Sequence, residues 1–374
     1  MTILTVIVGA GGTGSYVINN LLNLYRVRTK DRHRVMLIDG DVVEEKNLLR
    51  QGFLRKDLNK GKSEALINRF RGMVGHKVLL AAHTGYVQSL QDIDRSLEVL
   101  MDLGEKVDPD DISEVILVSC VDNNLARLRL TMAQFKVYQD FNCRVSFVDS
   151  GNEEWYGQVL VSVLDPEYPN PVTFNENRVK FDEGKIKGHW LNNIFVLMDD
   201  WKNKLTRGDH EISCDVITES SPQNIATNMT AASGVLLVVK NILDREPVPK
   251  NVFFNTKQGV NQIKDNLVNQ EQYTKRLNEL VEYVNGEGKV FIFSVGEEYM
   301  DEDLVDEEDY EDDLDSLDGL SWDDLEEDED DLPVVGYIED DLEDWLDFEE
   351  DEASVSEVPK GRNNRSLFNE ARDW

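Results

Sequence analysis

Cysteine is scarce in this sequence, and its few cysteines are not paired. The three, Cys120, Cys143 and Cys214, are far apart, and no two of them form a CxxC pair. A zinc site with four thiolate ligands therefore cannot be built from them. Unpaired thiols in a chain of this size are typical of a reducing compartment.

Other absences exclude further classes of protein. The start of the chain lacks the charged segment and the cleavage site of a signal peptide. No window supplies about 18 consecutive apolar residues, so we expect no membrane span. The five histidines show no metal-ligand spacing, and the body has no basic stripe of the kind that binds nucleic acids. We expect a cytoplasmic protein with no membrane partner and no direct nucleic-acid partner.

Positive charge is missing from one long stretch near the end of the chain. Residues 297–352 hold 32 of the 74 acidic residues and no lysine or arginine, whereas the rest of the chain is nearly neutral. Self-repulsion keeps such a segment extended, so residues 297–374 are predicted to be a disordered tail. Three interpretations stay open: a solubilising tail, a partner-docking segment around Trp345, Leu346 and Phe348, and a mimic of nucleic acid that masks a basic surface.

Strand and helix patterns alternate through the first part of the chain. Short apolar runs predict strands at 3–9, 34–39, 76–81, 114–121 and 144–149. Helical spacing of apolar residues predicts helices at 15–25, 60–71, 86–102 and 123–138. This alternation requires a parallel sheet, and it predicts an α/β fold with a doubly wound, mainly parallel, Rossmann-like sheet.

The pattern changes in the second part. Residues 155–164 predict a strand that leaves the core, and residues 224–244 predict a long helix. The stretch between them, 165–213, is irregular and is interpreted as an insertion or crossover. A strand, a polar helix and a strand follow at 251–255, about 260–285 and 289–294. The predicted organisation is a Rossmann-like domain at 1–255, a helix-strand extension at 256–296 and the tail at 297–374.

A glycine loop joins the first strand to the first helix. Residues 9–14, GAGGTG, satisfy GxGxxG through Gly9, Gly11, Gly12 and Gly14. Glycines let the backbone turn sharply and let its N–H groups approach a phosphate at the helix N-terminus. Asp39 ends the second strand, where its carboxylate can accept hydrogen bonds from ribose hydroxyls. The loop predicts a nucleotide site without choosing among NAD, FAD and ATP, and a tight turn with no ligand is the alternative.

The polar residues that follow Asp39 favour ATP. Asn47, Arg50 and Gln51 come within twelve residues of it, and Lys62 begins the next helix. Two cations suit a triphosphate, whose charge shifts during nucleotidyl transfer. The pyrophosphate of a dinucleotide is already held by backbone N–H groups, which argues against an NAD-dependent oxidoreductase. The alternative is that Arg50 and Lys62 are solvated surface cations.

Together these residues resemble the ThiF-type adenylyltransferases. That superfamily includes the activating enzymes of ubiquitin-like proteins and the enzymes that adenylate sulfur-carrier proteins. The matching motifs are GAGGTGS at 9–15, DGDVVEEKNLLRQ at 39–51, Lys62, and Asp122-Asn123 followed by Arg127. The resemblance covers roughly residues 3–160, and a weaker resemblance is found at 214–244.

The resemblance implies a role for each matching residue. The glycine loop would hold ATP, Asp39 would bind the ribose, and Asn47, Arg50 and Lys62 would contact the phosphates. Asp122 would coordinate Mg²⁺, which offsets phosphate charge. The same nucleotide site would include Asp41, Gln51 and Asn123. The implied reaction is attack by the C-terminal glycine carboxylate of a small ubiquitin-like or sulfur-carrier protein on the α-phosphate of ATP, which gives an acyl-adenylate and pyrophosphate.

The resemblance also implies an acyl acceptor and a partner subunit. In many members a cysteine at the distance of Cys214 from the long helix accepts the acyl group as a thioester or persulfide; a partly buried structural thiol is the alternative. Cys120 and Cys143 are interpreted as core residues. The family is homodimeric, but this chain begins at the first strand, without the helix that carries an arginine into the partner's site. A catalytically degenerate nucleotide-binding adaptor with a docking tail is therefore the alternative function.

Overall fold

The structure is a computed structural model. It describes residues 1–28, 30–49, 51–76, 78–175, 177–197, 201–205, 224–263 and 269–293, which all belong to one compact unit, Met1–Asp301. Two predicted site residues, Arg50 and Cys214, lie outside the described residues, and so does the acidic tail.

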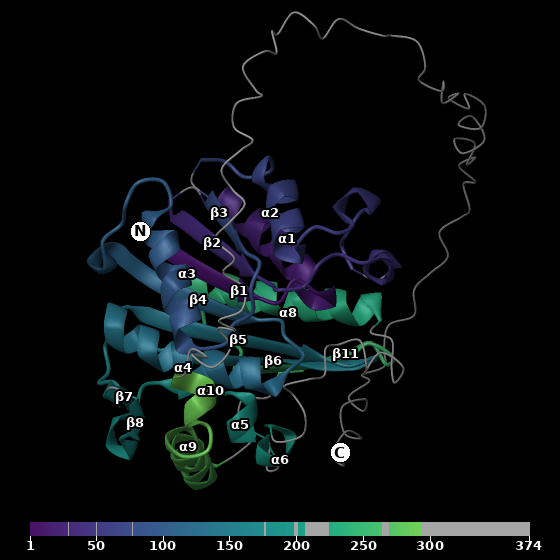
Figure 1. Cartoon of the computed structure of the whole chain (residues 1–374). Coiled ribbons are helices and arrows are strands. Elements are labelled where there is room, and N and C mark those ends of the chain that lie inside the picture. Colours follow the sequence, from purple (N-terminus) through teal and green to yellow (C-terminus); the bar gives the residue numbers. More distant parts are fainter. Residues whose placement is uncertain are drawn as a thin grey trace, which may run out of the picture. The chain divides into compact units, whose positions relative to one another are not determined.

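Five neighbouring strands of the sheet are parallel and extend to one of its edges (Figure 1). β1 (Thr2–Val8) lies between β2 (Arg32–Ile38) and β4 (Ile112–Ser119), and β3 (Val78–His83) and β5 (Arg144–Asn152) flank these in the order β3-β2-β1-β4-β5. The order reverses between β1 and β4, which is the point where doubly wound sheets bind ligands. The predicted α/β fold is confirmed.

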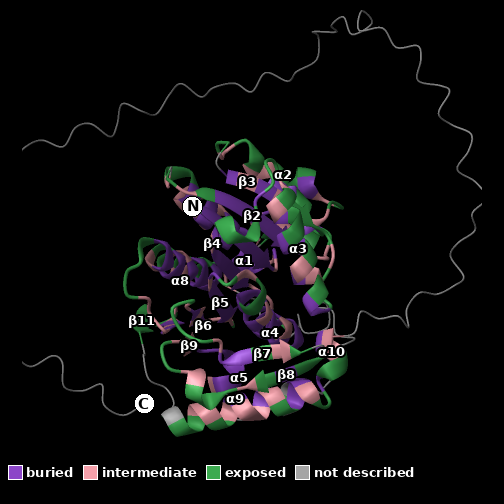
Figure 2. Cartoon of the chain, turned by 90° about the vertical axis from the view of Figure 1, so that its left-hand side faces the viewer, coloured by how far each residue is buried: buried purple, intermediate pink, exposed green. Residues whose placement is uncertain are grey.

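Helices cover both faces of this sheet, so its strands are almost wholly buried (Figure 2). On one face lie α1 (Gly12–Val27), α2 (Lys62–Arg71) and α8 (Ile225–Asp244). On the other face lie α3 (Leu90–Asp102) and α4 (Asn124–Phe141). Helical spacing explains why α1 packs there; its buried side chains include Val17, Ile18, Leu21, Leu22 and Tyr25.

An antiparallel extension widens the sheet beyond β5. β6 (Tyr156–Leu164) pairs with β5, β10 (Asn251–Asn255) pairs with β6, and β11 (Val260–Ile263) forms the edge. The two-residue strand β9 (Trp190–Leu191) also pairs with β6. The strands predicted at 155–164 and 251–255 are therefore confirmed.

The region predicted to be irregular contains some regular structure. β7 (Val172–Asn175) and β8 (Arg178–Phe181) form a separate hairpin. Two short helices follow, α5 (Ile194–Leu197) and α6 (Trp201–Leu205). Isolated 3-10 turns occur at Glu45–Leu49 (η1), Arg55–Asp57 (η2), Pro109–Asp111 (η3) and Glu183–Lys185 (η4).

Two predictions near the end of the described chain are wrong. Residues 289–294 were expected to form a strand, but Lys289–Phe293 form the short helix α10, which buries Ile292 against the core. A mostly apolar run of five residues does not distinguish a strand from a helix, and here packing against α4 and α9 favours the helix. The polar helix expected at about 260–285 is α9 (Gln270–Asn285), which starts later because residues 260–263 pair with β10.

α8 is long and apolar enough to cross a membrane by length and composition alone. In the structure 44% of its most apolar window is buried, and its inner face packs on α1 and on β5 and β6. These contacts are those of a core helix.

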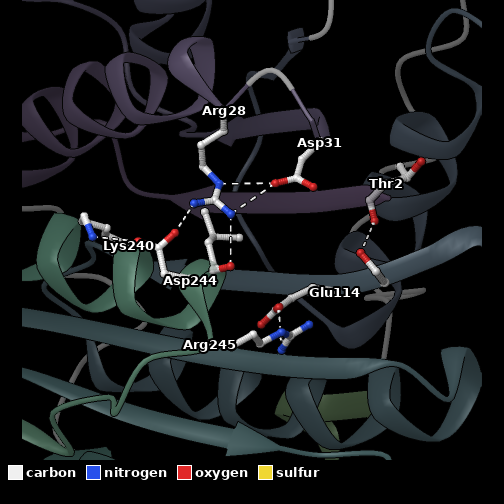
Figure 3. A network of polar contacts seen from close by, with 9 residues as sticks. Thr2, Arg28, Asp31, Glu114, Lys240, Asp244 and Arg245 are labelled. Atoms are coloured by element: carbon white, nitrogen blue, oxygen red, sulfur yellow. Dashed lines mark hydrogen bonds and ion pairs between the residues drawn. The ribbon is translucent and has the colours of Figure 1, made fainter.

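Ion pairs tie α1 and α8 together at the amino-terminal edge of the parallel strands (Figure 3). Arg28, at the end of α1, pairs with Asp31 at 3.2 Å and with Asp244, and its Nη2 donates to the carbonyl of Leu243 at 3.0 Å. Arg245, just after α8, lies 3.2 Å from the buried carboxylate of Glu114. Burial raises the pKa of Glu114 to about 7, against the opposing effect of the nearby arginines.

Candidate nucleotide-binding site

The glycine loop lies at the carboxyl edge of the parallel strands, where β1 turns into α1. Gly9 has a φ of +95°, and its N–H donates to the carbonyl of Ile38 at 2.8 Å. A Cβ on Gly9 would lie 2.6 Å from the carbonyl oxygen of Cys120, and one on Gly14 would overlap the carbonyl of Gly9. Both positions therefore require glycine, whereas a Cβ on Gly11 would meet nothing within 4 Å.

The N-terminus of α1 is open to an anion. Gly11 is its N-cap and provides no side-chain cap, and no acidic residue lies in the first turn. The N–H groups of the first turn, including that of Gly12, have no partner within the helix. Together with the helix dipole, they favour a phosphate at this position. The structure thus supplies the geometry that the glycine motif predicts.

Asp39 is tied to the glycine loop by its carboxylate. One oxygen accepts from the N–H of Ala10 at 2.5 Å, and the other accepts from the N–H of Asp41 at 2.9 Å. Burial raises the pKa of Asp39, and these two hydrogen bonds and the charge of Lys62 oppose the rise. A carboxylate has about four acceptor positions, so two remain for hydroxyl groups such as those of a ribose.

Lys62 lies close enough to Asp39 for its charge to lower the pKa of that carboxyl. Its amine donates to a carboxylate oxygen of Asp41 at 2.7 Å, and its N–H donates to the carbonyl of the same residue at 2.9 Å. Tyr86 donates its hydroxyl to the other oxygen of Asp41 at 2.5 Å. Lys62 is only 7% exposed, so it is not a solvated surface lysine, which was the alternative that the sequence left open. We call it the held cation, because Asp41 fixes its amine.

The loop between β2 and α2 is fixed against the start of α1. Ser15, in the first turn of α1, accepts from the N–H of Gly52 at 3.2 Å. Asn47 is buried, and its side-chain oxygen accepts from the N–H of Glu44 at 2.8 Å, so it holds the shape of η1. The side-chain oxygen of Gln51 is buried and has no hydrogen-bond partner among the residues that the structure describes. Such an acceptor requires a water or a ligand group.

Asp122 and Asn123 lie at the end of β4, next to the glycine loop. The N–H of Cys120 donates to the carbonyl of Val8 at 2.8 Å, which joins the ends of β4 and β1. Asp122 is exposed. Asn123 accepts from the N–H of Ala126 at 2.7 Å and so caps α4. Its side-chain oxygen is therefore occupied by the helix.

A magnesium ion fits the carboxyl edge of the sheet only if phosphate oxygens supply part of its coordination. No group of three or more histidine, cysteine, aspartate or glutamate side chains could hold a metal within the described ranges. Mg²⁺ is commonly held by one or two carboxylates together with substrate phosphates and waters. Asp122 could serve as that single carboxylate.

A polar triangle that sequence reasoning missed connects the glycine loop to α8. Thr13 donates its hydroxyl to the side-chain oxygen of Asn152 at 2.7 Å, and Asn152 donates to that of Asn228 at 2.8 Å. The three residues come from α1, β5 and α8. Asn152 and Asn228 lie 139 and 215 positions from Thr13 in the sequence, so no local signal could have placed the three together.

Two hollows of the surface lie away from the glycine loop. One, of about 460 Å³, lies between α4 and residues 166–173; the other, of about 530 Å³, lies at the amino-terminal edge beside Arg28 and Glu114. Neither is lined by a residue of the glycine loop.

The family assignment follows from the whole described body. A model of the ThiF family matches residues 3–275. The chain belongs to the ThiF family. The predicted resemblance is thereby confirmed and extends well beyond residue 160. ThiF-type proteins are adenylyltransferases, and the glycine loop, Asp39 and Lys62 lie within the matched range.

Several solved structures resemble the ThiF chain in fold. The crystal structure of PaaA is 18% identical, with a TM-score of 0.41. Structures of Escherichia coli MccB with ATP, and with AMPCPP and MccA, are both 16% identical, with TM-scores of 0.41 and 0.43. Each alignment covers 70% of this chain and 63% of the other, so the chain spans less than two thirds of these proteins. No curated protein matches the chain.

Proposed function

We propose that this chain uses ATP and Mg²⁺ to adenylate the C-terminal glycine of a small ubiquitin-like or sulfur-carrier protein. One observation carries the proposal: the glycine loop, Asp39 and the held cation Lys62 lie together at the switch point of the parallel sheet. An uncapped helix N-terminus suits the phosphates, and the adjacent carboxylate suits the ribose. Membership of the ThiF family supports the choice of adenylation over other uses of a nucleotide.

Lys62 would act on the phosphates of ATP. In the ligand-free chain its amine is held by Asp41, and Tyr86 holds the other oxygen of that carboxylate. An incoming phosphate oxygen can take the amine from Asp41, which keeps its bond to Tyr86. The cation then stands where negative charge accumulates on the departing pyrophosphate, and fixed charge at such a point stabilises the transition state.

Arg50 and Asp122 complete the proposed phosphate site. The guanidinium of Arg50 would offer bidentate contact to a phosphate. Mg²⁺, held by Asp122 and phosphate oxygens, would neutralise charge on the triphosphate. The carrier's carboxylate oxygen would attack the α-phosphorus, and the bond from that phosphorus to the bridging oxygen of pyrophosphate would break.

A second transfer would use Cys214. Burial raises the pKa of the Cys120 and Cys143 thiols to about 12, so both stay protonated at neutral pH and are poor nucleophiles. Cys214 is then the remaining candidate in the sequence. Its thiolate would attack the acyl carbonyl of the adenylate and release AMP, which leaves a thioester.

Two further partners belong to the proposal. A homodimer is supported by exposed apolar side chains along α8, namely Ile225, Met229 and Leu237, each at least 43% exposed. The acidic tail, residues 297–374, would dock a separate partner. We place the protein in the cytoplasm, where carrier proteins with free C-terminal glycines are activated.

Exchange of labelled pyrophosphate into ATP tests the proposal. The full chain is incubated with ATP, Mg²⁺ and candidate carriers, each matched with a version that lacks its C-terminal glycine. We expect exchange with one intact carrier and none with its truncated version. If the chain binds ATP but exchanges no pyrophosphate with any carrier, the adaptor function replaces the enzymatic one.

A further inference from the structure

Arg127 is a buried cation behind the nucleotide loop, on the first turn of α4. Its Nη2 donates to the carbonyl of Val121 at 2.7 Å and lies 3.4 Å from the carbonyl of Ser150. Its Nε lies 3.4 Å from a carboxylate oxygen of Asp149, and the two side chains are 8% and 2% exposed. One guanidinium thus connects the end of β4, the end of β5 and the start of α4.

The surroundings of this guanidinium are shaped for it. A Cβ on Gly151 would lie 2.8 Å from Nη2 of Arg127, so the absence of a side chain there leaves it room. Asp149 supplies the counter-charge that a buried cation requires. The rigid, planar guanidinium presents Nη2 to the backbone carbonyls and Nε to the carboxylate of Asp149 at the same time, whereas the flexible amine of lysine is a single point.

The carbonyl that Arg127 holds belongs to the residue before Asp122. On the other side of Asp122, Asn123 is fixed by its bond to the N–H of Ala126. The short turn from β4 to α4 is therefore held on both sides of Asp122. Arg127 contacts the backbone carbonyl of Val121. This contact can therefore set the backbone direction at Asp122, and Arg127 does not need to touch the nucleotide.

We propose that Arg127 is the positioning residue for Asp122. Its guanidinium, held by Asp149, fixes the Val121 peptide and thereby orients the Asp122 carboxylate toward the phosphate side of the glycine loop. The inference rests on the proposed function, in which Asp122 holds the metal ion on the triphosphate. Arg127 itself touches neither nucleotide nor metal.

Amide hydrogen exchange of the ligand-free full chain gives the first test. Arg127→Lys keeps the charge but loses the planar guanidinium, so amides of residues 121–126 should exchange at least 10-fold faster. Gln134→Met is the matched control, because Gln134 is buried two turns later on α4 and bonds the carbonyls of Val145 and Ser162. Equal acceleration in both variants, or none in either, would overturn the proposal.

Magnesium dependence of ATP binding gives the second test, by calorimetry on the same variants. Loss of an outer-shell partner typically weakens metal affinity 10- to 100-fold. Arg127→Lys should therefore raise the Mg²⁺ concentration at half-saturation at least 10-fold, with ATP affinity in EDTA unchanged. In an Asp122→Asn background the same substitution should change nothing further. Additive losses, or an equal Mg²⁺ shift in Gln134→Met, would contradict a positioning role.

A variant that crowds the guanidinium, and with it the side-chain amide of Gln158, covers the case in which Arg127→Lys does not fold. Gly151→Ala keeps both charges and should produce the same local exchange and the same Mg²⁺ shift. A folded Gly151→Ala protein with neither change would count against the proposal. Should the wild type exchange no pyrophosphate, the adenylation proposal fails, whereas the ligand-free hydrogen exchange still decides whether Arg127 positions the turn.

Discussion

The two edges of the parallel sheet carry polar clusters of opposite design. At the amino-terminal edge, Arg28 and Arg245 are matched by Asp31, Asp244 and Glu114, so each charge finds an opposite charge. At the carboxyl edge Lys62 is also paired with a carboxylate, that of Asp41, but Asp39 is held by backbone groups and not by an ion pair. Asp39 accepts from the N–H groups of Ala10 and Asp41, and α1 begins without a side-chain cap.

This difference separates a structural cluster from a ligand site. Paired charges hold α1, α8 and β4 together and leave little for a ligand to satisfy. The carboxyl edge has glycine positions that tolerate no Cβ, the buried cation Lys62, and a buried oxygen on Gln51 that no described residue hydrogen-bonds. We therefore expect substitutions at one edge to affect nucleotide binding and those at the other to affect stability alone.

The largest effect is expected in the glycine loop. Gly14→Ala should destabilise the fold by about 3 kcal/mol or more, because its Cβ would overlap the carbonyl of Gly9, and should abolish ATP binding. Gly11→Ala is the control in the same loop; its Cβ meets nothing within 4 Å, so stability should change by less than about 0.5 kcal/mol. Thermal unfolding and ATP titration measure both. A stable Gly14→Ala protein that binds ATP would refute the loop geometry.

The next effect concerns the held cation. Lys62→Met should slow carrier-dependent pyrophosphate exchange by about 100- to 1,000-fold, the usual loss when one charge-stabilising group is removed. Lys60→Met, two residues earlier at an exposed position, should change the rate less than about 2-fold, because exposed charges contribute little. The measurement is the initial rate of pyrophosphate exchange of each variant at saturating ATP. Equal rates for the two variants would remove Lys62 from the phosphate site.

A third prediction uses pH to examine the amino-terminal edge. The folded chain keeps a proton on Glu114 up to about pH 7, against a pKa of 4.5 for an unperturbed glutamate. Stability from this group is therefore complete below about pH 4.5 and is lost as pH rises through 7, by about 3 kcal/mol in all. Glu114→Gln should lose this slope in urea unfolding at pH 5 and pH 8. An unchanged slope would show that Glu114 titrates normally.

The smallest effect is expected at the end of α1. Arg28→Ala removes a guanidinium that pairs with Asp31 and Asp244, so the free energy of unfolding should fall by about 1 kcal/mol. ATP affinity should not change, because this residue lies at the edge opposite to the glycine loop. Urea unfolding and ATP calorimetry on one preparation test the pair of outcomes. If Arg28→Ala were as stable as the wild type but bound ATP more weakly, the two edges would not have the separate roles described above.

Local motifs made much of the carboxyl edge predictable. The glycine loop, Asp39 and Lys62 lie within one β-α-β-α unit, so their spacing fixes their meeting point. The Thr13–Asn152–Asn228 triangle and the Arg127–Asp149 pair depend on which distant strands become neighbours, which no local pattern records. Tyr86 reaches Asp41 from the loop after β3, and it too had no signal.

Short apolar segments were the weakest part of the fold prediction. Residues 289–293 are apolar enough for a strand, but their contacts with α4 and α9 stabilise a helix instead. Residues 260–263, two apolar and two polar, are all exposed, and their pairing with β10 makes them a strand. In both cases a tertiary neighbour overrode the local pattern.

A crystal structure of the full chain with AMPCPP and Mg²⁺ tests the central claim most directly. The account predicts phosphates over the N-terminus of α1, the ribose hydroxyls on Asp39, and the Lys62 amine moved from Asp41 to a phosphate oxygen. A nucleotide bound elsewhere, or one bound at the loop while Lys62 stays on Asp41 and away from every phosphate, would contradict it.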